Sequence, residues 1–330
     1  MMEESALGPR TINAYAALSR SSNLQRWQYE SRPLGDEDVE VQVSHCALAG
    51  YDVERLDDMY GDSTFPLVVG HEIAGTVTAA GPSVKNLVVG DRAGVGFHIW
   101  SCRNEDAQHP CSKCAKGDDL HCPRAVFVFG SKYQDGARTY GGLADYVRLR
   151  SDYAVKIPDT IPPELAAPLM CAGLTVFSPL KRHFVRALGG TPIALSYSSN
   201  KREEAIALGG SGTEFVDLSD SEQLRQAADS LDLLLVTGVA PGRSYDLALV
   251  RNNGTVVVLC VAEEPRRVRG KRVTITGSIT GSLQDTRDML ATAAEHNVRP
   301  MIEKMPMAAV NDGLQRLRSG KARYCVVLEN

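Results

Sequence analysis

The sequence has no apolar run that approaches the roughly 20 residues needed to cross a bilayer, so we expect no membrane-spanning helix. It begins MMEESALGPRTINAYAAL, which lacks the basic and then apolar stretch of a secretory signal. Neither sign of charge dominates, because the formal net charge is −4, and this gives no reason to expect nucleic acid or a membrane surface as a partner. We therefore expect a cytoplasmic protein.

A chain of 330 residues is long enough for two domains. Residues 36–160 alternate short β-type runs such as VEVQV and LADYVRL with Gly, Pro and Asp, which is typical of a barrel-like β domain. After Pro162, expected helices such as NKREEAIAL and RSYDLALVRN alternate with apolar strands such as PIALSY and GTVVVLCV. This alternation predicts a parallel sheet covered by helices on both faces.

Four of the eight cysteines lie between Cys102 and Cys122, and they could form disulfides or bind metal. The reducing cytosol favours thiolate ligands over disulfides. Zinc needs four soft or borderline ligands in a tetrahedron, and the loops between them vary in length. The sequence therefore favours a zinc site in this stretch, with a metal-free loop of spare thiols as the alternative.

Several ordered segments resemble the zinc alcohol dehydrogenase type of medium-chain dehydrogenase/reductases, and most resemble its cinnamyl-alcohol-dehydrogenase-like, NADP-dependent aldehyde reductases. They are GHEIAGTV (70–77), VVGDRAGVG (88–96), APLMCAGLTVFSPL (167–180), GSITGS (277–282) and the final GKARYCVVLEN. The resemblance implies an α/β chain. A GroES-like, β-barrel-like catalytic domain would occupy 1–160, a truncated Rossmann-type parallel-sheet domain 161–298, and residues 299–330 would return to the first domain.

The resemblance also implies a structural zinc lobe. Its last three ligands match Cys111, Cys114 and Cys122, but the family's first ligand position is occupied here by Gln108. Cys102 can still close the site, and His109 is the alternative fourth ligand.

The family's catalytic zinc site is incomplete in this sequence. Its cysteine ligand is replaced by Ala49, whereas His71, Glu72 and Cys171 match the remaining ligands and the adjacent carboxylate. Tyr51 and Glu54 occupy the positions of the family's proton relay. We interpret these changes as loss of the catalytic zinc; drift with function intact is the alternative.

The family's glycine-rich cofactor turn is missing as well, because SPLKRHF leads directly into VRALGGTPIALSYSSNKREEA. We expect the segment 171–188 to form one helix and a neighbouring strand to take the place of the lost one. The remaining basic segment resembles a vestigial NADP 2′-phosphate site, although an N-cap and a solvated helix start would need no ligand. Its residues are Ser196, Ser198, Lys201 and Arg202. We expect NADP(H) to bind weakly or not at all.

Loss of both sites favours non-redox chemistry on a small organic substrate in the interdomain cleft, such as cyclisation, isomerisation, elimination or addition. The expected catalytic residues are Tyr51, Glu54, His71, Glu72 and Cys171. The alternative is an NADPH-dependent, catalytic-zinc-independent reductase of an aldehyde, activated alkene or iminium, and the second alternative is an inactive scaffold. A homodimer is expected through the edge strand RVTITGS.

Overall fold

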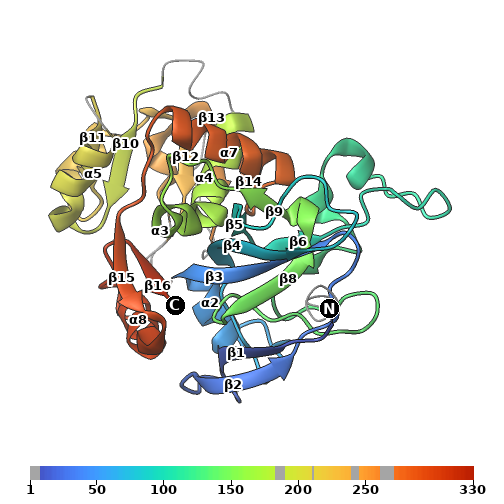
Figure 1. Cartoon of the computed structure of the whole chain (residues 1–330). Helices are drawn as coiled ribbons and strands as arrows, with labels where there is room; N and C mark the ends of the chain where they lie inside the picture. Colours follow the sequence, from blue (N-terminus) through green and yellow to red (C-terminus); the bar gives the residue numbers. More distant parts are fainter. Residues whose placement is uncertain (1–7, 183–189, 210–211, 239–244, 261–270) are drawn as a thin grey trace. The chain divides into compact units, whose positions relative to one another are not determined.

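The computed structural model describes residues 8–182, 190–209, 212–238, 245–260 and 271–330. The chain divides into two compact units, which we call unit 1 (Met1–Leu174 and Gly281–Asn330) and unit 2 (Thr175–Thr280). The colours of Figure 1 follow the chain through both. The expected domain limits of 1–160, 161–298 and 299–330 stay a prediction.

Unit 1 is built on a seven-stranded open sheet with the order β15-β16-β3-β4-β5-β9, in which β8 also pairs with β3. β15 and β16 are parallel, whereas the other pairs are antiparallel. The strands are β3 (Asp38–Leu48), β4 (Glu72–Ala80), β5 (Arg92–Val95), β8 (Tyr146–Arg150), β9 (Ala154–Lys156), β15 (Ile302–Pro306) and β16 (Cys325–Glu329). Two hairpins accompany the sheet: β1 (Thr11–Ala16) with β2 (Gln25–Glu30), and β6 (His98–Trp100) with β7 (Val126–Phe127).

The core of unit 1 lies around β3 and β4. Val41 on β3 and Val77 on β4 are buried and register with each other across the pair. Gly75 permits this close approach, because a Cβ atom there would lie 2.1 Å from the carbonyl oxygen of Gln42. Apolar alternation thus predicts the sheet, and a glycine sets the spacing of its central strands.

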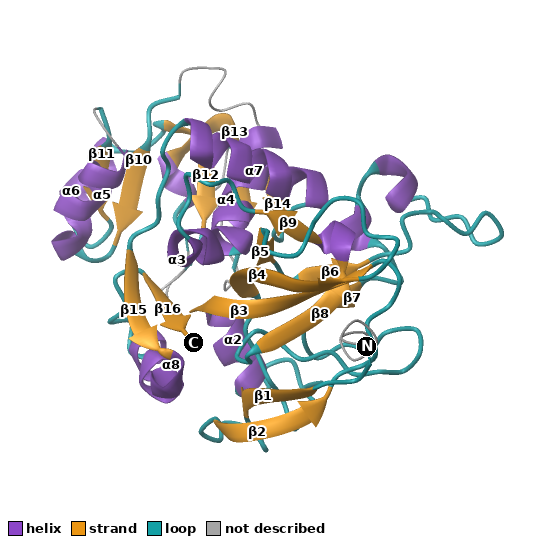
Figure 2. Cartoon of the chain, in the orientation of Figure 1, coloured by secondary structure: helices purple, strands orange, loops and turns teal. Residues whose placement is uncertain are grey.

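Helices of unit 1 pack beside this sheet (Figures 1 and 2). Val310 and Leu314 of α8 join the apolar core. The helical elements are α2 (Gly50–Leu56), η1 (Cys114–Lys116), η2 (Asp119–His121), η3 (Ser151–Tyr153), α3 (Pro163–Ala166), η4 (Ala167–Met170), α7 (Leu283–Glu295), η7 (Met307–Ala309) and α8 (Val310–Arg318). α4 (Ala172–Arg182) begins in unit 1 and continues into unit 2.

Unit 2 contains two short parallel sheets, one of β10 and β11 and one of β12, β13 and β14. Its elements are β10 (Ile193–Ser196), η5 (Ser199–Lys201), α5 (Arg202–Gly209), β11 (Glu214–Asp217), α6 (Ser221–Gln226), β12 (Leu231–Val236), η6 (Leu247–Leu249), β13 (Val250–Val258) and β14 (Thr274–Gly277). Together with unit 1, this confirms the expected fold class, a GroES-like β domain without a closed barrel plus a truncated parallel-sheet domain.

Two expectations about unit 2 are wrong. Within the described residues no strand replaces the lost one, because β10 and β12 belong to separate sheets. The described part of RSYDLALVRN forms η6 and the start of β13 rather than a helix. Asp246 caps η6 by accepting a hydrogen bond from the Ala248 N–H. Leu249 and Val250 are buried in the apolar core, and this burial favours the strand that follows η6. The expected helix over 171–188 is α4 as far as Arg182, and its remainder lies outside the described residues.

Where the structure describes the chain, no single helix is long and apolar enough to cross a membrane. The bent pair Pro163–Met170 and Ala172–Lys181, with 59° between the helices, reaches the required length and composition only when both are counted. The cytoplasmic location stays a prediction.

Candidate active site and metal centres

A buried carboxylate holds the imidazole of His71. Asp52 lies in the first turn of α2 and is fully buried. Its carboxylate accepts hydrogen bonds from the N–H groups of Ala49 and Gly70, both at 2.9 Å, and lies 3.0 Å from His71 Nδ1. This geometry fixes the ring and leaves Nε2 as the nitrogen that can serve chemistry.

Gly70 gives His71 its position. Its φ of 101° lies in the left-handed region, and a Cβ atom there would lie 2.7 Å from Cys46 Sγ and 2.9 Å from the Leu143 nitrogen. Only glycine fits this turn without displacing its neighbours. The turn places His71 immediately before β4, whose first residue is Glu72.

His71, Glu72 and Cys171 form one cluster, in which their potential ligand atoms all lie within 4.8 Å of one another. Glu72 Oε1 accepts a hydrogen bond of 2.6 Å from the Ala172 N–H at the start of α4. Burial raises the pKa of Glu72 to about 7. Burial opposes charge on His71, but Asp52 and Cys171 outweigh it and hold the pKa of His71 well above its ordinary value.

The other two expected catalytic residues differ in their relation to this cluster. The Tyr51 ring stands edge-on to His71, with 5.6 Å between ring centroids, and packs on Phe97 and Phe129. Glu54 instead accepts a hydrogen bond of 2.6 Å from the Tyr60 hydroxyl. The structure therefore brings together four of the five expected residues and directs Glu54 elsewhere. Their catalytic roles stay a prediction.

Three side chains are enough, by number, for a catalytic zinc site with one open position. His71, Glu72 and Cys171 provide that number. Ala49 adds no ligand, because it has only a methyl side chain and serves as the N-cap of α2. The cluster can therefore act as a metal site only if Glu72 is a ligand, or without metal as a set of hydrogen-bonding groups.

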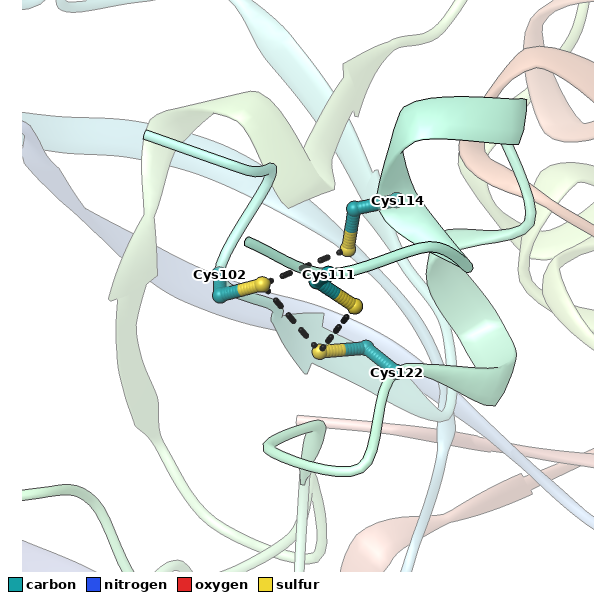
Figure 3. Close-up of side chains that lie close together, drawn as sticks. All are labelled: Cys102, Cys111, Cys114 and Cys122. Carbon is teal, nitrogen blue, oxygen red and sulfur yellow. Dashed lines mark hydrogen bonds between the residues drawn. The ribbon is translucent and has the colours of Figure 1, made fainter. Parts of the chain in front are cut away.

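Four thiols come together in the expected lobe (Figure 3). The Sγ–Sγ distances are 3.6 Å for Cys102–Cys114, 3.9 Å for Cys111–Cys122 and 3.5 Å for Cys122–Cys102. A tetrahedron with Zn–S bonds of about 2.3 Å has edges of roughly 3.8 Å. Backbone N–H groups of Cys114 and Lys113 lower the pKa of Cys111 to about 7, which favours its thiolate. The four residues therefore fit zinc.

The loop between Cys102 and Cys111 folds so that neither Gln108 nor His109 joins the cluster. His109 Nδ1 lies 2.7 Å from Asp106, and this side chain is 72% exposed. The Gln108 N–H also donates to Asp106. Of the two candidates for the fourth position, the geometry thus favours Cys102.

The expected 2′-phosphate segment follows β10, at the carboxyl end of a parallel strand. Ser196 ends β10, Ser198 precedes η5, and Arg202 begins α5. The Ser198 N–H donates to Ser196 Oγ at 3.1 Å, and the Arg202 guanidinium lies 5.6 Å from the Phe215 ring centroid. This is the edge at which parallel α/β sheets bind ligands. Cofactor binding there stays a prediction.

The chain resembles known proteins over nearly its whole length. Residues 35–159 match the alcohol dehydrogenase GroES-like domain. Cinnamyl alcohol dehydrogenase 7 of Arabidopsis thaliana is 31% identical, and the match covers 95% of this chain and 94% of that protein. A cinnamyl alcohol dehydrogenase structure from Sorghum bicolor has a TM-score of 0.88 at 30% identity, covering 97% and 98%.

A Helicobacter pylori structure, complexed with NADP(H), shows the same fold with a TM-score of 0.85 at 22% identity, covering 97% of this chain and 98% of that one. At this sequence identity, the match supports only the fold. The full-length matches at 30% identity or more, by contrast, identify the family. The chain therefore belongs to the medium-chain dehydrogenase/reductases of the zinc alcohol dehydrogenase type, among the homologues of cinnamyl alcohol dehydrogenases.

Proposed function

We propose that this protein is an NADPH-dependent reductase of a small aldehyde, activated alkene or iminium compound that works without a catalytic zinc. The observation that carries the proposal is the full-length match to cinnamyl alcohol dehydrogenases at 30% identity or more. Because these relatives are oxidoreductases, the comparisons do not support the non-redox chemistry that the sequence favoured, and the reductase alternative fits them better.

Reduction of an aldehyde adds a hydride to the carbonyl carbon and a proton to the oxygen, yields an alcohol, and leaves NADP⁺. Bound NADPH would supply the hydride. The chain's own part is to hold the oxygen as charge develops on it and to deliver the proton. Tyr51 and His71 are suited to both tasks, because their rings are in contact and Asp52 orients the imidazole.

The zinc-independent form of the reaction rests on Ala49. An alanine cannot replace a thiolate ligand, whereas hydrogen-bond donors fixed in a buried site can stabilise an oxyanion in place of a metal. His71 is 1% exposed and its ring is fixed by Asp52. We assign zinc instead to the four cysteines of the lobe, as a structural ion.

NADPH would be held mainly through its 2′-phosphate, by Ser198, Lys201 and Arg202. Each charge-assisted hydrogen bond contributes on the order of 1.5–3 kcal/mol. Without the glycine-rich turn the pyrophosphate loses its main anion site, and ordering a long dinucleotide opposes binding. We therefore expect a dissociation constant no better than roughly 0.1 mM.

The test combines binding with turnover. Calorimetric titration with NADPH should give this weak affinity, and Lys201→Ala should weaken it about tenfold, as expected for one lost charge-assisted bond. Arg225→Ala is the matched control, because Arg225 is an exposed cation of unit 2 whose partner is Glu222 on the same helix. Consumption of NADPH with a panel of aldehydes, enals and iminium compounds then measures the reaction.

Absence of NADPH binding at millimolar concentration, together with no oxidation of NADPH by any class of substrate, would overturn the proposal. Conversion of a substrate without NADPH would favour the non-redox alternative. Turnover that requires added zinc and is lost in Cys171→Ser would overturn the zinc-independent form.

A further inference from the structure

Unit 1 contains a cavity of about 350 Å³ that shares no lining residue with the His71 cluster. It lies among the β1–β2 hairpin, strand β8 and the segment 128–140. Its apolar lining includes Ile12, Val95, Ile99, Val128, Val147 and Leu149. Pockets that bind small molecules begin at about 300 Å³, so a small organic ligand fits by volume.

Aromatic rings also line this cavity. Tyr29, Tyr133 and Tyr140 line it, and the rings of Tyr29 and Tyr140 lie 4.3 Å apart. Trp27 packs against both, with centroids 5.5 Å from Tyr29 and 5.2 Å from Tyr140. Rings grouped in this way favour a planar ligand, which can stack on them or meet their edges.

Three arginines also line the cavity, Arg32, Arg138 and Arg148. Arg148 is paired with Glu40 at 2.7 Å, and Arg32 with Asp38 at 2.6 Å. Arg32 Nε nevertheless has no hydrogen-bond partner in the described part of the chain, although that atom is buried. That atom is not accessible from the cavity, and the Arg32 guanidinium lies over the Tyr133 ring, 4.3 Å from its centroid. The charges of Arg32 and Arg148 are thus balanced within the protein.

Arg138 is the cation that lacks a countercharge. Its Nη2 donates to Thr64 and to the Pro66 carbonyl, and its guanidinium lies 5.5 Å from the Tyr140 ring centroid. Among the described residues no carboxylate pairs with it. Glu30, the one carboxylate in the lining, is exposed and hydrogen-bonded to Thr11. Arg138, whose charge no described carboxylate balances, therefore favours an anion in the cavity.

We propose that this cavity is a second ligand site, which binds a small planar carboxylate such as an aromatic acid. The carboxylate accepts hydrogen bonds from Arg138, and the ring packs on Tyr29 and Tyr140 between the aliphatic side chains. Planar guanidinium groups are suited to carboxylates because two parallel N–H donors match the two oxygens. The site does not depend on the proposed reductase activity.

The test uses benzoate as the probe and the fluorescence of Trp27 as the readout. The sequence contains two tryptophans, so Trp100→Phe leaves Trp27 as the only one. Titration of the full-length Trp100→Phe protein should give a saturable change, and calorimetry on the unsubstituted chain should give the same affinity. Benzamide, which has a similar shape without the charge, should bind at least tenfold more weakly.

Arg138→Gln should weaken benzoate binding about tenfold or more, as expected for a lost charge-assisted bond, and Arg138→Lys should weaken it less. Arg26→Gln is the matched control, because Arg26 is an exposed arginine on β2, the strand that carries Tyr29, and lines no part of the cavity. His71→Ala should leave the affinity unchanged. Circular dichroism confirms that each variant is folded.

Two results would overturn the site. One is the absence of saturable binding at roughly 10 mM benzoate by both methods, because water then suffices for the donors of Arg138. The other is loss of benzoate binding in His71→Ala with no effect of Arg138→Gln, which would place the ligand at the His71 cluster. Equal affinity for benzamide and benzoate would overturn the assignment to an anion.

Discussion

His71 Nδ1 lies 3.0 Å from the carboxylate of Asp52, and the two side chains are 1% and 0% exposed. The same carboxylate accepts hydrogen bonds from the N–H groups of Ala49 and Gly70. It therefore links the start of α2 to the residue before His71. The imidazole is therefore oriented by a group that is itself fixed by the backbone. A substitution at Asp52 should therefore alter the orientation of His71, even though Asp52 need not contact the substrate.

We expect Asp52→Asn to reduce kcat about 10–100-fold, the range seen when a carboxylate that orients a functional histidine is removed. The KM for NADPH should hardly change, since the proposed cofactor residues are in unit 2. Steady-state kinetics measure both values. Asp312→Asn, at an exposed position of α8, is the control. If Asp52→Asn kept full kcat, the orienting role of Asp52 would be wrong.

We expect one zinc per chain, bound in the cysteine lobe. Cys102→Ser should lose the ion and lower the melting temperature, because binding of a structural zinc contributes directly to folding free energy. His109→Ala should retain the ion, since His109 is turned toward Asp106. Elemental analysis and thermal melts are the measurements. Two zinc ions per chain, with one lost in His71→Ala, would instead show a metal on the His71 cluster.

We expect a homodimer through β14, because this strand is the edge of its sheet and all four of its residues are exposed. Ile275, which is 46% exposed, presents apolar surface there. Ile275→Lys should give a monomer in light scattering, since a charged residue on an edge strand opposes strand pairing. Leu208→Lys, at an exposed position of α5, should leave the dimer intact. A monomeric unsubstituted protein would contradict this prediction.

We expect an acid-dependent contribution to stability from Glu303 on β15 and Arg316 on α8. Arg316 donates two hydrogen bonds to the carboxylate, at 2.6 and 2.9 Å, and lowers the pKa of Glu303. Because the folded-state pKa is below the unfolded one, this stabilisation is present above the unfolded value and is lost as pH falls through the folded value.

Glu303→Gln should therefore destabilise the protein by about 1 kcal/mol at neutral pH. The difference from the unsubstituted chain should begin to fall below the ordinary pKa of a glutamate and should vanish below the lowered pKa of Glu303. Urea unfolding at several pH values checks the direction. A constant difference at every pH would show that packing, and not charge, accounts for the loss.

Much of the architecture could be predicted because apolar alternation and glycine positions are local signals. The strand at Val39–Val43, the parallel strands of unit 2 and the lobe cysteines follow from such patterns. The segment RSYDLALVRN could not be assigned from its own residues. Its two leucines and its valine suit a helix or a buried strand equally, and the long-range pairing of β12 with β13 decides between them.

Asp52 shows a similar limit within the site. It stands in the segment Cys46–Asp52, but only the fold brings it to His71 and Gly70, eighteen or more positions later in the chain. Glu54 shows the converse, because its position in the motif predicted a catalytic residue and the structure pairs it with Tyr60. Motif spacing therefore finds residues that are expected near a site, and three-dimensional packing decides which of them come into contact there.

The two short sheets of unit 2 leave four outer strands, β10, β11, β12 and β14, in its described part, where one joined sheet would leave two. Each outer strand carries backbone N–H and C=O groups that no neighbouring strand satisfies on one side. Amide protons there are protected by fewer cooperative contacts than those of β3, which pairs with three strands. In native-state hydrogen exchange, unit 2 should consequently open at a lower free energy than the seven-stranded sheet of unit 1.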